Sequence, residues 1–170
     1  MKKPIIISLL YFFLTCLASF SQGEWIEEVI DPETGLRTGK IEINGVIATI
    51  NSGVDLSEIN LEGADLQGAN LERATLIFTN FKGANLKGAN LTYSRSNLAN
   101  FSNANLSESN LSWSILQGSD FSSANLYKAN LSSTNMSNAN FKDSNLENAS
   151  LYNVNIHRTN FSGSIISGSS

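Results

Sequence analysis

The sequence of 170 residues is poor in the residue types that build catalytic, metal-binding or cross-linked sites. It contains one cysteine, Cys16, one histidine, His157, and two prolines. One cysteine cannot form an internal disulfide, and one histidine without a second histidine or cysteine beside it does not complete a zinc site. The acidic residues do not cluster at metal-ligand spacing. The sequence therefore predicts a non-enzymatic protein without a cofactor or metal.

Charged residues are also scarce, at 15% of the chain, and the formal net charge is −4. Without Lys2 and Lys3, nine basic and fifteen acidic residues remain, a net charge of −6. Residues 22–53 hold −4 of this charge, which leaves about −2 for the rest of the chain. A field this weak does not favour steering toward nucleic acid or a basic partner, so no nucleic acid contact is expected.

The start of the chain, residues 1–21, is expected to be a cleaved export signal. Lys2 and Lys3 precede an apolar run from Ile5 to Leu17, and small residues follow at positions 19 and 21. The run is short for a membrane span, which needs about 20 residues. The mature protein should therefore lie in the periplasm or outside the cell, with no membrane contact after cleavage; an uncleaved anchor is the alternative.

A lipoprotein attached through Cys16 is a disfavoured alternative for the same segment. The three residues before Cys16 are Phe, Leu and Thr, and they lack the small-residue lead of a lipid-attachment site. If Cys16 is removed with the signal, the mature protein has no cysteine, so its stability must come from its repeats.

Residues 22–53 are predicted to be a β-rich N-terminal cap or linker, in which Glu24 to Ile50 form a small β-meander. The stretch from Trp25 to Ile30 alternates and is rich in β-formers, and the segment that follows it, DPETG, has turn chemistry. Apolar runs flank Asn44-Gly45, a favoured two-residue hairpin turn. A cap is expected because the end of a solenoid exposes unpaired backbone groups.

A five-residue unit recurs without insertion or deletion over residues 54–168, before a two-residue tail at 169–170. Each unit has a small residue, then usually Asn or Asp, then a large apolar residue that we call the centre, and two variable residues. The 23 centres run from Leu56 to Ile166, and all except Ser96 are Leu, Phe, Met or Ile. The small residue and the centre lie two positions apart, so both should point inward on an extended segment.

Four pentapeptide units are predicted to make one coil. Five of the centres are phenylalanine and recur at every fourth unit, so a four-sided coil would stack their rings in one column. These residues are Phe81, Phe101, Phe121, Phe141 and Phe161. The asparagine before most centres is expected to support turns and to form ladders between coils rather than to bind a ligand.

The units Gly63-Ala64-Asp65-Leu66-Gln67 and Gly83-Ala84-Asn85-Leu86-Lys87 resemble the A-(D/N)-L-x-x signature of the pentapeptide repeat family, and the resemblance covers residues 54–168. It implies a right-handed quadrilateral β-helix with the centre and the small residue inside. Members of this family include acidic cytoplasmic proteins that mimic duplex DNA and protect type II topoisomerases, and most members have no established activity.

One side of the predicted coil departs from the pattern. Thr75, Arg95 and Ile115 replace Asn at intervals of four units, and aromatic residues lie at the adjacent corner. We predict an interaction patch here, because exposed apolar surface with Trp, Tyr and Arg is typical of binding sites. Its residues are Arg73, Ile77, Phe78, Tyr93, Arg95, Leu98, Trp113 and Ile115. The alternative is a local register irregularity at Ser96, with Leu98 turned inward.

Two functions fit the sequence. The first is an exported, non-enzymatic binding or scaffold module for an unknown protein or surface ligand. The second is inhibition or protection of a topoisomerase by DNA mimicry, which requires a cytoplasmic protein with a strongly negative surface. The last residues show no helical cap, so an end-to-end homodimer is a further expectation.

Overall fold

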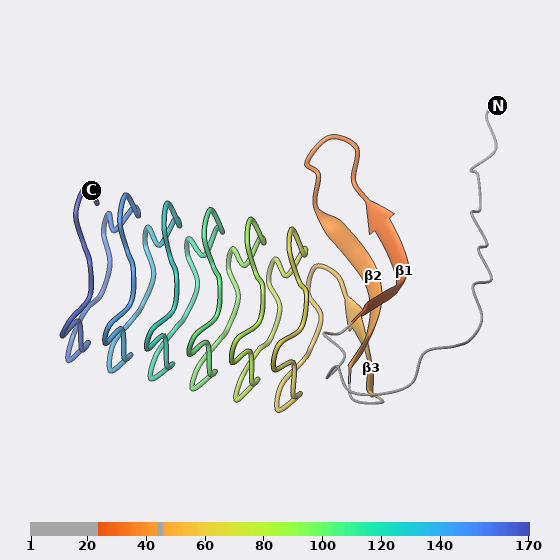
Figure 1. The fold of residues 1–170 in the computed structure, drawn as a ribbon, viewed down its shortest axis with the longest axis horizontal. Coiled ribbons are helices and arrows are strands. Elements are labelled where there is room, and N and C mark those ends of the chain that lie inside the picture. Colours follow the sequence, from red (N-terminus) through yellow and green to blue (C-terminus); the bar gives the residue numbers. More distant parts are fainter. Residues whose placement is uncertain (1–23, 44–45) are drawn as a thin grey trace, which may run out of the picture.

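The computed structural model describes residues 24–43 and 46–170, which form a three-stranded sheet followed by a stack of coils (Figure 1). The predicted export signal, with Cys16, lies outside these residues. Among the residues described, no helix has the length and apolar character needed to span a bilayer.

The sheet is an antiparallel meander of β1 (Glu24–Ile30), β2 (Arg37–Ile43) and β3 (Val46–Ile50), in the order β1-β2-β3. In the β2–β3 pair, Ile43 lies opposite Val46, which is the register of a two-residue hairpin. The predicted meander is confirmed, and its two turn residues lie outside the described part of the chain.

One face of the sheet is buried in the same hydrophobic core as the first coils. Side chains alternate between buried and exposed over residues 41–43 of β2 and 47–50 of β3, and the inward set is at most 5% exposed. This set is Ile41, Ile43, Ala48 and Ile50, and it joins the core cluster that contains Leu56 and Leu61 of the first coil. The sheet therefore shields apolar centres that would otherwise face water.

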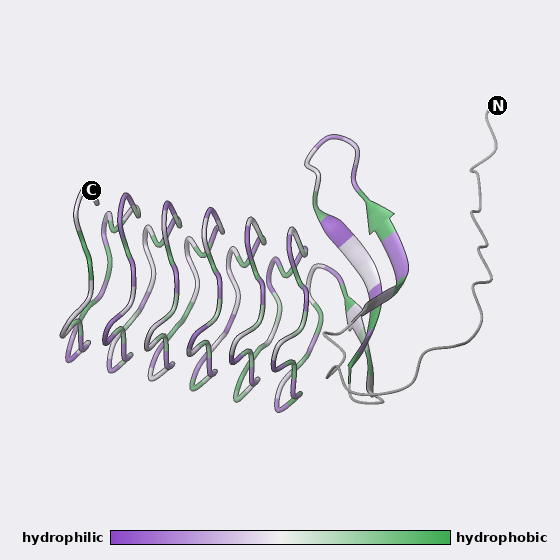
Figure 2. Ribbon diagram, in the orientation of Figure 1, coloured by the Kyte–Doolittle hydropathy of each residue, from purple (hydrophilic) through white to green (hydrophobic). Residues whose placement is uncertain are grey.

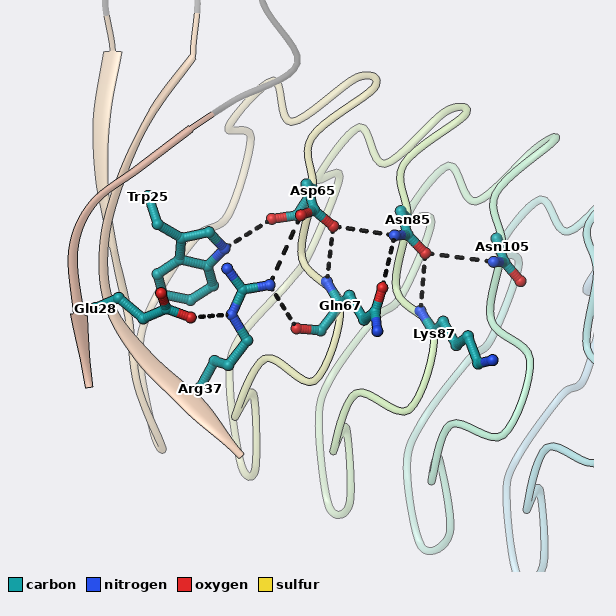
Figure 3. Close-up of polar contacts among 8 residues, drawn as sticks. All are labelled: Trp25, Glu28, Arg37, Asp65, Gln67, Asn85, Lys87 and Asn105. Carbon is teal, nitrogen blue, oxygen red and sulfur yellow. Dashed lines mark hydrogen bonds and ion pairs between the residues drawn. The ribbon is translucent and has the colours of Figure 1, made fainter. Parts of the chain in front are cut away.

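Arg37 joins the sheet to the coils through its backbone and also through its side chain, whose contacts Figure 3 shows. Its amide donates to the Gly68 carbonyl at 2.7 Å and its carbonyl accepts from the Asn70 amide at 2.8 Å. Its Nη1 donates to the Gln67 carbonyl at 3.1 Å and lies 3.7 Å from a carboxylate oxygen of Asp65. The start of β2 thus continues the hydrogen bonding of the coils.

Trp25 and Glu28 hold the Arg37 side chain in this position (Figure 3). The guanidinium carbon lies 4.6 Å from the Trp25 ring centroid, and the indole N–H donates to the Asp65 carbonyl at 2.9 Å. Arg37 Nε donates to the Glu28 carboxylate. A cation over an indole with a charged hydrogen bond is a stabilising arrangement, so β1 is fixed against the first coil.

Each coil contains four pentapeptides, because each parallel bridge joins a residue to the equivalent residue four units later. The bridges use the residue before each centre, as in Asp65↔Asn85 and Asn85↔Asn105, and they occur on all four sides of the coil. Successive coils lie side by side, as Figure 1 shows. The predicted unit of four pentapeptides per coil is confirmed.

The interior is filled by the centres and the small residues, as predicted. Every centre from Leu61 to Leu146 and every small residue from Ala64 to Ala149 is buried, and apolar residues recur on each coil (Figure 2). The five phenylalanines form one column, with neighbouring ring centroids 4.6 to 5.3 Å apart. Small residues are required because two large side chains per unit would not fit this narrow coil at normal packing density.

The asparagines before the centres form the expected ladders on two sides of the coil. The Asn85 Oδ1 atom accepts from the Lys87 amide at 3.3 Å, and its Nδ2 donates to Asp65 Oδ1 at 3.0 Å (Figure 3). Asn105 Nδ2 donates in turn to Asn85 Oδ1 at 3.3 Å. The amide groups are thus used within the fold, which gives these residues a structural role.

The corners are tight turns with left-handed backbone. The centre carbonyl accepts from the amide three positions later, as in Ala84 to Phe81 at 2.9 Å, and the residue two after each centre has a positive φ. This combination is the pattern of a type II turn. Sixteen of these corner residues, between Glu58 and Arg158, are not glycine. The fold therefore accepts side chains at its corners.

Ser96 does not interrupt the coil. The Arg95↔Ile115 bridge keeps the regular register on this side. Ser96 is fully buried with its hydroxyl 3.2 Å from that of Ser94, and Leu98 is 52% exposed. The alternative of a register irregularity with Leu98 turned inward is therefore wrong, because the two hydroxyls satisfy each other inside the coil and Leu98 stays outside.

The last coil has a partly open apolar end. Its centres Ile156 and Ile166 are 52% and 42% exposed, and Leu151 and Phe161 are half-buried. The end-to-end homodimer stays a prediction.

Candidate interaction face

Residues 73–78, 93–98 and 113–118 lie on the same side of three successive coils, and we call their outer surface the aromatic face. All eight residues of the predicted patch belong to it. They are Arg73, Ile77, Phe78, Tyr93, Arg95, Leu98, Trp113 and Ile115. All are exposed except Ile77, which is half-buried. Their role in binding stays a prediction.

The first corner of the face carries a stack of side chains. The Tyr93 and Trp113 rings lie 6.2 Å apart between centroids, with their planes 14° from parallel. The Arg73 guanidinium carbon lies 5.8 Å from the Tyr93 centroid, on the coil before. Tyr93 therefore has a neighbour on each side, whereas the corner residue after Trp113 is the small Ser133. The two rings are 51% and 58% exposed.

The second corner carries Phe78 and Leu98, which are 56% and 52% exposed. The next residue in this column is Gly118, and a Cβ atom on it would lie 2.8 Å from Leu98 Cδ2. Leu98 therefore lies over the Gly118 corner. An open hollow of about 350 Å³ lies beside them, lined by Asn97, Leu98, Gln117, Gly118 and Asn138.

The floor between the corners consists of Thr75, Arg95 and Ile115, joined by the bridges Thr75↔Arg95 and Arg95↔Ile115. Ile115 is 38% exposed, and Ile77 lies half-buried near the second corner. None of these side chains can continue an asparagine ladder. The floor therefore offers apolar contact and a guanidinium group instead of self-paired amides.

Large apolar residues occupy strained backbone positions at both corners. The φ angles are 59° for Phe78 and Tyr93, 57° for Leu98 and 64° for Trp113. This conformation favours glycine and asparagine and costs a bulky residue about 1 kcal/mol. The fold requires a left-handed corner here but does not require a bulky side chain. Strained residues of this kind tend to gather at functional sites.

The aromatic face is positively charged in an acidic protein. Its three segments contain Arg73 and Arg95 and no acidic residue, whereas the chain has a net charge of −4. Arg73 lies 3.7 Å from Glu72 on the neighbouring side. Arg95 forms no ion pair within residues 24–43 and 46–170. The Arg95 guanidinium is therefore open to an external anion.

An anionic residue lies on the coil before this face. Hydrogen bonds from the Ser57 hydroxyl at 2.7 Å and the Ser57 amide at 2.9 Å lower the pKa of Asp55 below its ordinary value. Asp55 is thus charged at neutral pH, and the acid-free surface begins one coil later.

The hollow beside Gly118 was not predicted from the sequence. The carboxamides of Asn97, Gln117 and Asn138 line it, and they make no hydrogen bond within the described part of the chain. Gly118 is the signal that could have indicated the hollow. It occupies the corner position that Phe78 and Leu98 hold on the two preceding coils, and it has no side chain there.

Elsewhere, the structure assembles no candidate reaction centre from the residues it describes. His157, which follows the centre Ile156, is exposed. No group of three or more His, Cys, Asp or Glu side chains in the described ranges could hold a metal ion.

The fold and this face define a β-solenoid that presents side chains at its corners. The Pentapeptide repeats family matches this chain with eight copies, over residues 55–92, 97–132 and 129–168. The chain therefore belongs to the pentapeptide repeat family, and the predicted right-handed quadrilateral β-helix is confirmed.

Several solved structures of pentapeptide repeat proteins are similar to this chain. One from the cyanobacterium Cyanothece 51142 is 26% identical and covers 66% of this chain and 84% of its own, with a TM-score of 0.37. One from the thylakoid lumen of Arabidopsis thaliana is 32% identical, with coverage of 59% and 66% and a TM-score of 0.38. QnrB1, a plasmid-mediated fluoroquinolone resistance protein, is 22% identical, with coverage of 68% and 59% and a TM-score of 0.45. No match is found among curated proteins.

Proposed function

We propose that this protein is an exported, non-enzymatic binding module whose aromatic face binds a segment of a partner protein. The Tyr93–Trp113 stack is the observation that supports this most directly. It places two large exposed rings at strained corners, while the core beneath is already filled by the buried centres Leu91 and Leu111. Exposed Trp, Tyr and Arg side chains are the types that dominate binding at interfaces.

The partner segment should carry apolar and acidic side chains. The two corners and Ile115 offer apolar surface, and the acid-free face with Arg73 and Arg95 attracts carboxylates. Complementary charge sets the orientation of a partner and speeds its association, while burial of the rings supplies most of the affinity.

Other classes of partner fit this face less well. Arg73 and Trp113 flank the two sides of the Tyr93 ring, so a nucleic acid base or a sugar has little room to stack on it. Two arginines also form a much smaller basic surface than a nucleic acid backbone normally requires.

A library of displayed random dodecapeptides, selected on the purified protein, tests this proposal. Enriched peptides should combine apolar and acidic residues, and they should not be retained by a Tyr93→Asn/Trp113→Asn variant. Asparagine suits the left-handed corner, so this variant should keep the circular dichroism spectrum of the original protein. Peptides without acidic residues, or peptides retained equally by both proteins, would contradict the proposal.

Export is the second part of the proposal, and the composition of residues 1–21 supports it. N-terminal sequencing of the protein from separated cell fractions should find a chain that begins at Gln22 in the periplasm or the medium. The intact chain with Met1 in the cytosol would contradict export.

DNA mimicry is the alternative function, and the surface charges do not favour it. Lys82 lies 3.2 Å from Glu62, and Lys87 lies 3.4 Å from Glu108, so cations neutralise acidic groups along the coils. A supercoiling assay with purified DNA gyrase distinguishes the two functions: the binding module should leave the activity of gyrase unchanged, and a DNA mimic should alter it.

A further inference from the structure

We infer that the hollow beside Gly118 is the recognition pocket of the aromatic face, and that it takes a leucine-sized side chain of a peptide whose carboxylate pairs with Arg95. This inference rests on the proposed function, in which the face binds a partner segment. The hollow measures about 350 Å³, near the lower end of the volumes typical of small-ligand sites.

The turn does not require glycine at position 118. The same column has Leu98 before it and Asn138 after it, with φ angles of 57° and 59°. Gly118 itself has a φ of 69°, so a side chain could occupy this corner as it does on the neighbouring coils. What glycine provides is space: a Cβ atom would lie 2.8 Å from Leu98 Cδ2. The absence of a side chain therefore lets Leu98 lie over this corner, where it forms the apolar wall of the hollow.

The polar lining suits a peptide backbone. Three carboxamides, those of Asn97, Gln117 and Asn138, border the hollow. The ladder asparagines use their amides within the fold, whereas these three carboxamides make no hydrogen bond within the described residues. A carboxamide offers both donors and an acceptor, as a peptide unit does. The lining can therefore pair with the amide N–H and carbonyl on either side of an inserted side chain.

Arg95 supplies the charge next to this lining. It lies two positions before Asn97, and the two residues flank the buried Ser96, so both face outward. It has no ion pair within the part of the chain that the structure describes, and no acidic residue belongs to the aromatic face. A carboxylate beside the inserted side chain is the group that this guanidinium binds best.

N-acetyl-leucine is the probe that matches this pocket, since it carries an isobutyl side chain, an amide and a carboxylate. Titration into the isotope-labelled protein, followed by NMR, should shift the amide signals of Leu98, Gly118 and Asn138. Gly118→Asn should weaken binding at least tenfold, because its side chain fills the hollow and displaces only the flexible end of Leu98.

The matched control is Gly88→Asn. Gly88 is a corner glycine with a φ of 65° and open space around its Cβ position, on another side of the coil. This variant should bind N-acetyl-leucine within twofold of the original protein. Equal binding by the Gly118→Asn variant, or shifts spread over all exposed apolar residues, would overturn the inference.

The carboxylate is tested with N-acetyl-leucine amide, which lacks the charge. It should bind several-fold more weakly than N-acetyl-leucine, and Arg95→Gln should abolish this difference; a difference that survives in Arg95→Gln would overturn the role of Arg95.

The inference and the proposed function can fail separately. If the selected peptides lose affinity for Tyr93→Asn/Trp113→Asn but bind Gly118→Asn normally, the pocket alone is excluded. If N-acetyl-leucine binds at Gly118 but the selected peptides bind Tyr93→Asn/Trp113→Asn normally, the proposed function alone is excluded.

Discussion

Trp113 lies over Tyr93 of the preceding coil, with the two rings 14° from parallel and their centroids 6.2 Å apart. One pentapeptide corner supplies each ring, and both corners have left-handed backbone. The stack is therefore built on a rigid frame whose core does not depend on it. This relationship separates the stability of the fold from the function of the face.

We expect Tyr93→Asn/Trp113→Asn to change the free energy of unfolding by no more than about 1 kcal/mol. The ring pair contributes about 0.5–1.5 kcal/mol, and asparagine relieves strain of about 1 kcal/mol at each corner. Urea denaturation followed by circular dichroism measures this change. A loss of several kcal/mol would show that the rings serve the fold.

The phenylalanine column should be far more sensitive. Phe121→Ala should lower the free energy of unfolding by about 3–5 kcal/mol, because it leaves a cavity between two stacked rings of a buried column. Phe121→Leu should cost less than about 1.5 kcal/mol, since Leu61 already occupies this column on the first coil. Equal losses for the two variants, measured by denaturation, would contradict this account of the core.

The buried serine pair predicts a non-additive result. Ser96→Ala leaves the Ser94 hydroxyl buried without its partner, which should cost about 1–3 kcal/mol. Ser94→Ala/Ser96→Ala removes both hydroxyls and should recover most of that loss. A double variant less stable than the single one in denaturation experiments would contradict the mutual hydrogen bond.

Arg37→Ala should destabilise the N-terminal end by roughly 2 kcal/mol, because it removes the contacts to Trp25, Glu28 and the Gln67 carbonyl. The coils interact mainly with their neighbours, so amide hydrogen exchange should accelerate around Gly68 and Asn70 and stay unchanged near Phe141. Uniform acceleration along the chain would contradict a local cap.

Asp55 should contribute to stability in a pH-dependent manner. The Ser57 hydroxyl and amide lower its pKa in the folded chain, so its contribution is present above the ordinary pKa of about 3.8 and is lost as the pH falls through the lower folded value. Ser57→Ala should move the pKa back toward 3.8, because the amide alone then remains as a donor. NMR titration of the Asp55 carboxyl measures both values, and an unchanged pKa in Ser57→Ala would contradict the role of the hydroxyl.

Much of the fold could be predicted from the sequence because the same five-residue pattern recurs over residues 54–168. The spacing of Phe81 and Phe101 indicates the length of the coil, and the two-position spacing of Ala84 and Leu86 indicates which side chains are buried. The eight patch residues could also be placed, since a coil of four units assigns each position to one of its sides.

The remaining features depend on side-chain contacts that periodicity does not encode. The Arg37 side chain contacts Trp25 in the sheet and Asp65 in the first coils. Trp25 and Arg37 lie outside the repeat, so its periodicity does not predict these contacts. Ser96 breaks the apolar pattern of the centres, yet its hydroxyl forms a hydrogen bond with the Ser94 hydroxyl inside the coil. Only the packed structure shows this hydrogen bond. The hollow beside Gly118 likewise follows from the direction of the Leu98 side chain.

Titration calorimetry of one selected peptide against three proteins tests the binding role of the aromatic face most directly. The proteins are the original chain, Tyr93→Asn/Trp113→Asn, and Tyr152→Asn, which alters an exposed tyrosine two coils beyond Trp113 and outside the face. We predict that the double variant binds at least tenfold more weakly, while Tyr152→Asn binds as the original does. Equal affinity for all three proteins, with unchanged circular dichroism, would contradict the binding role of this face.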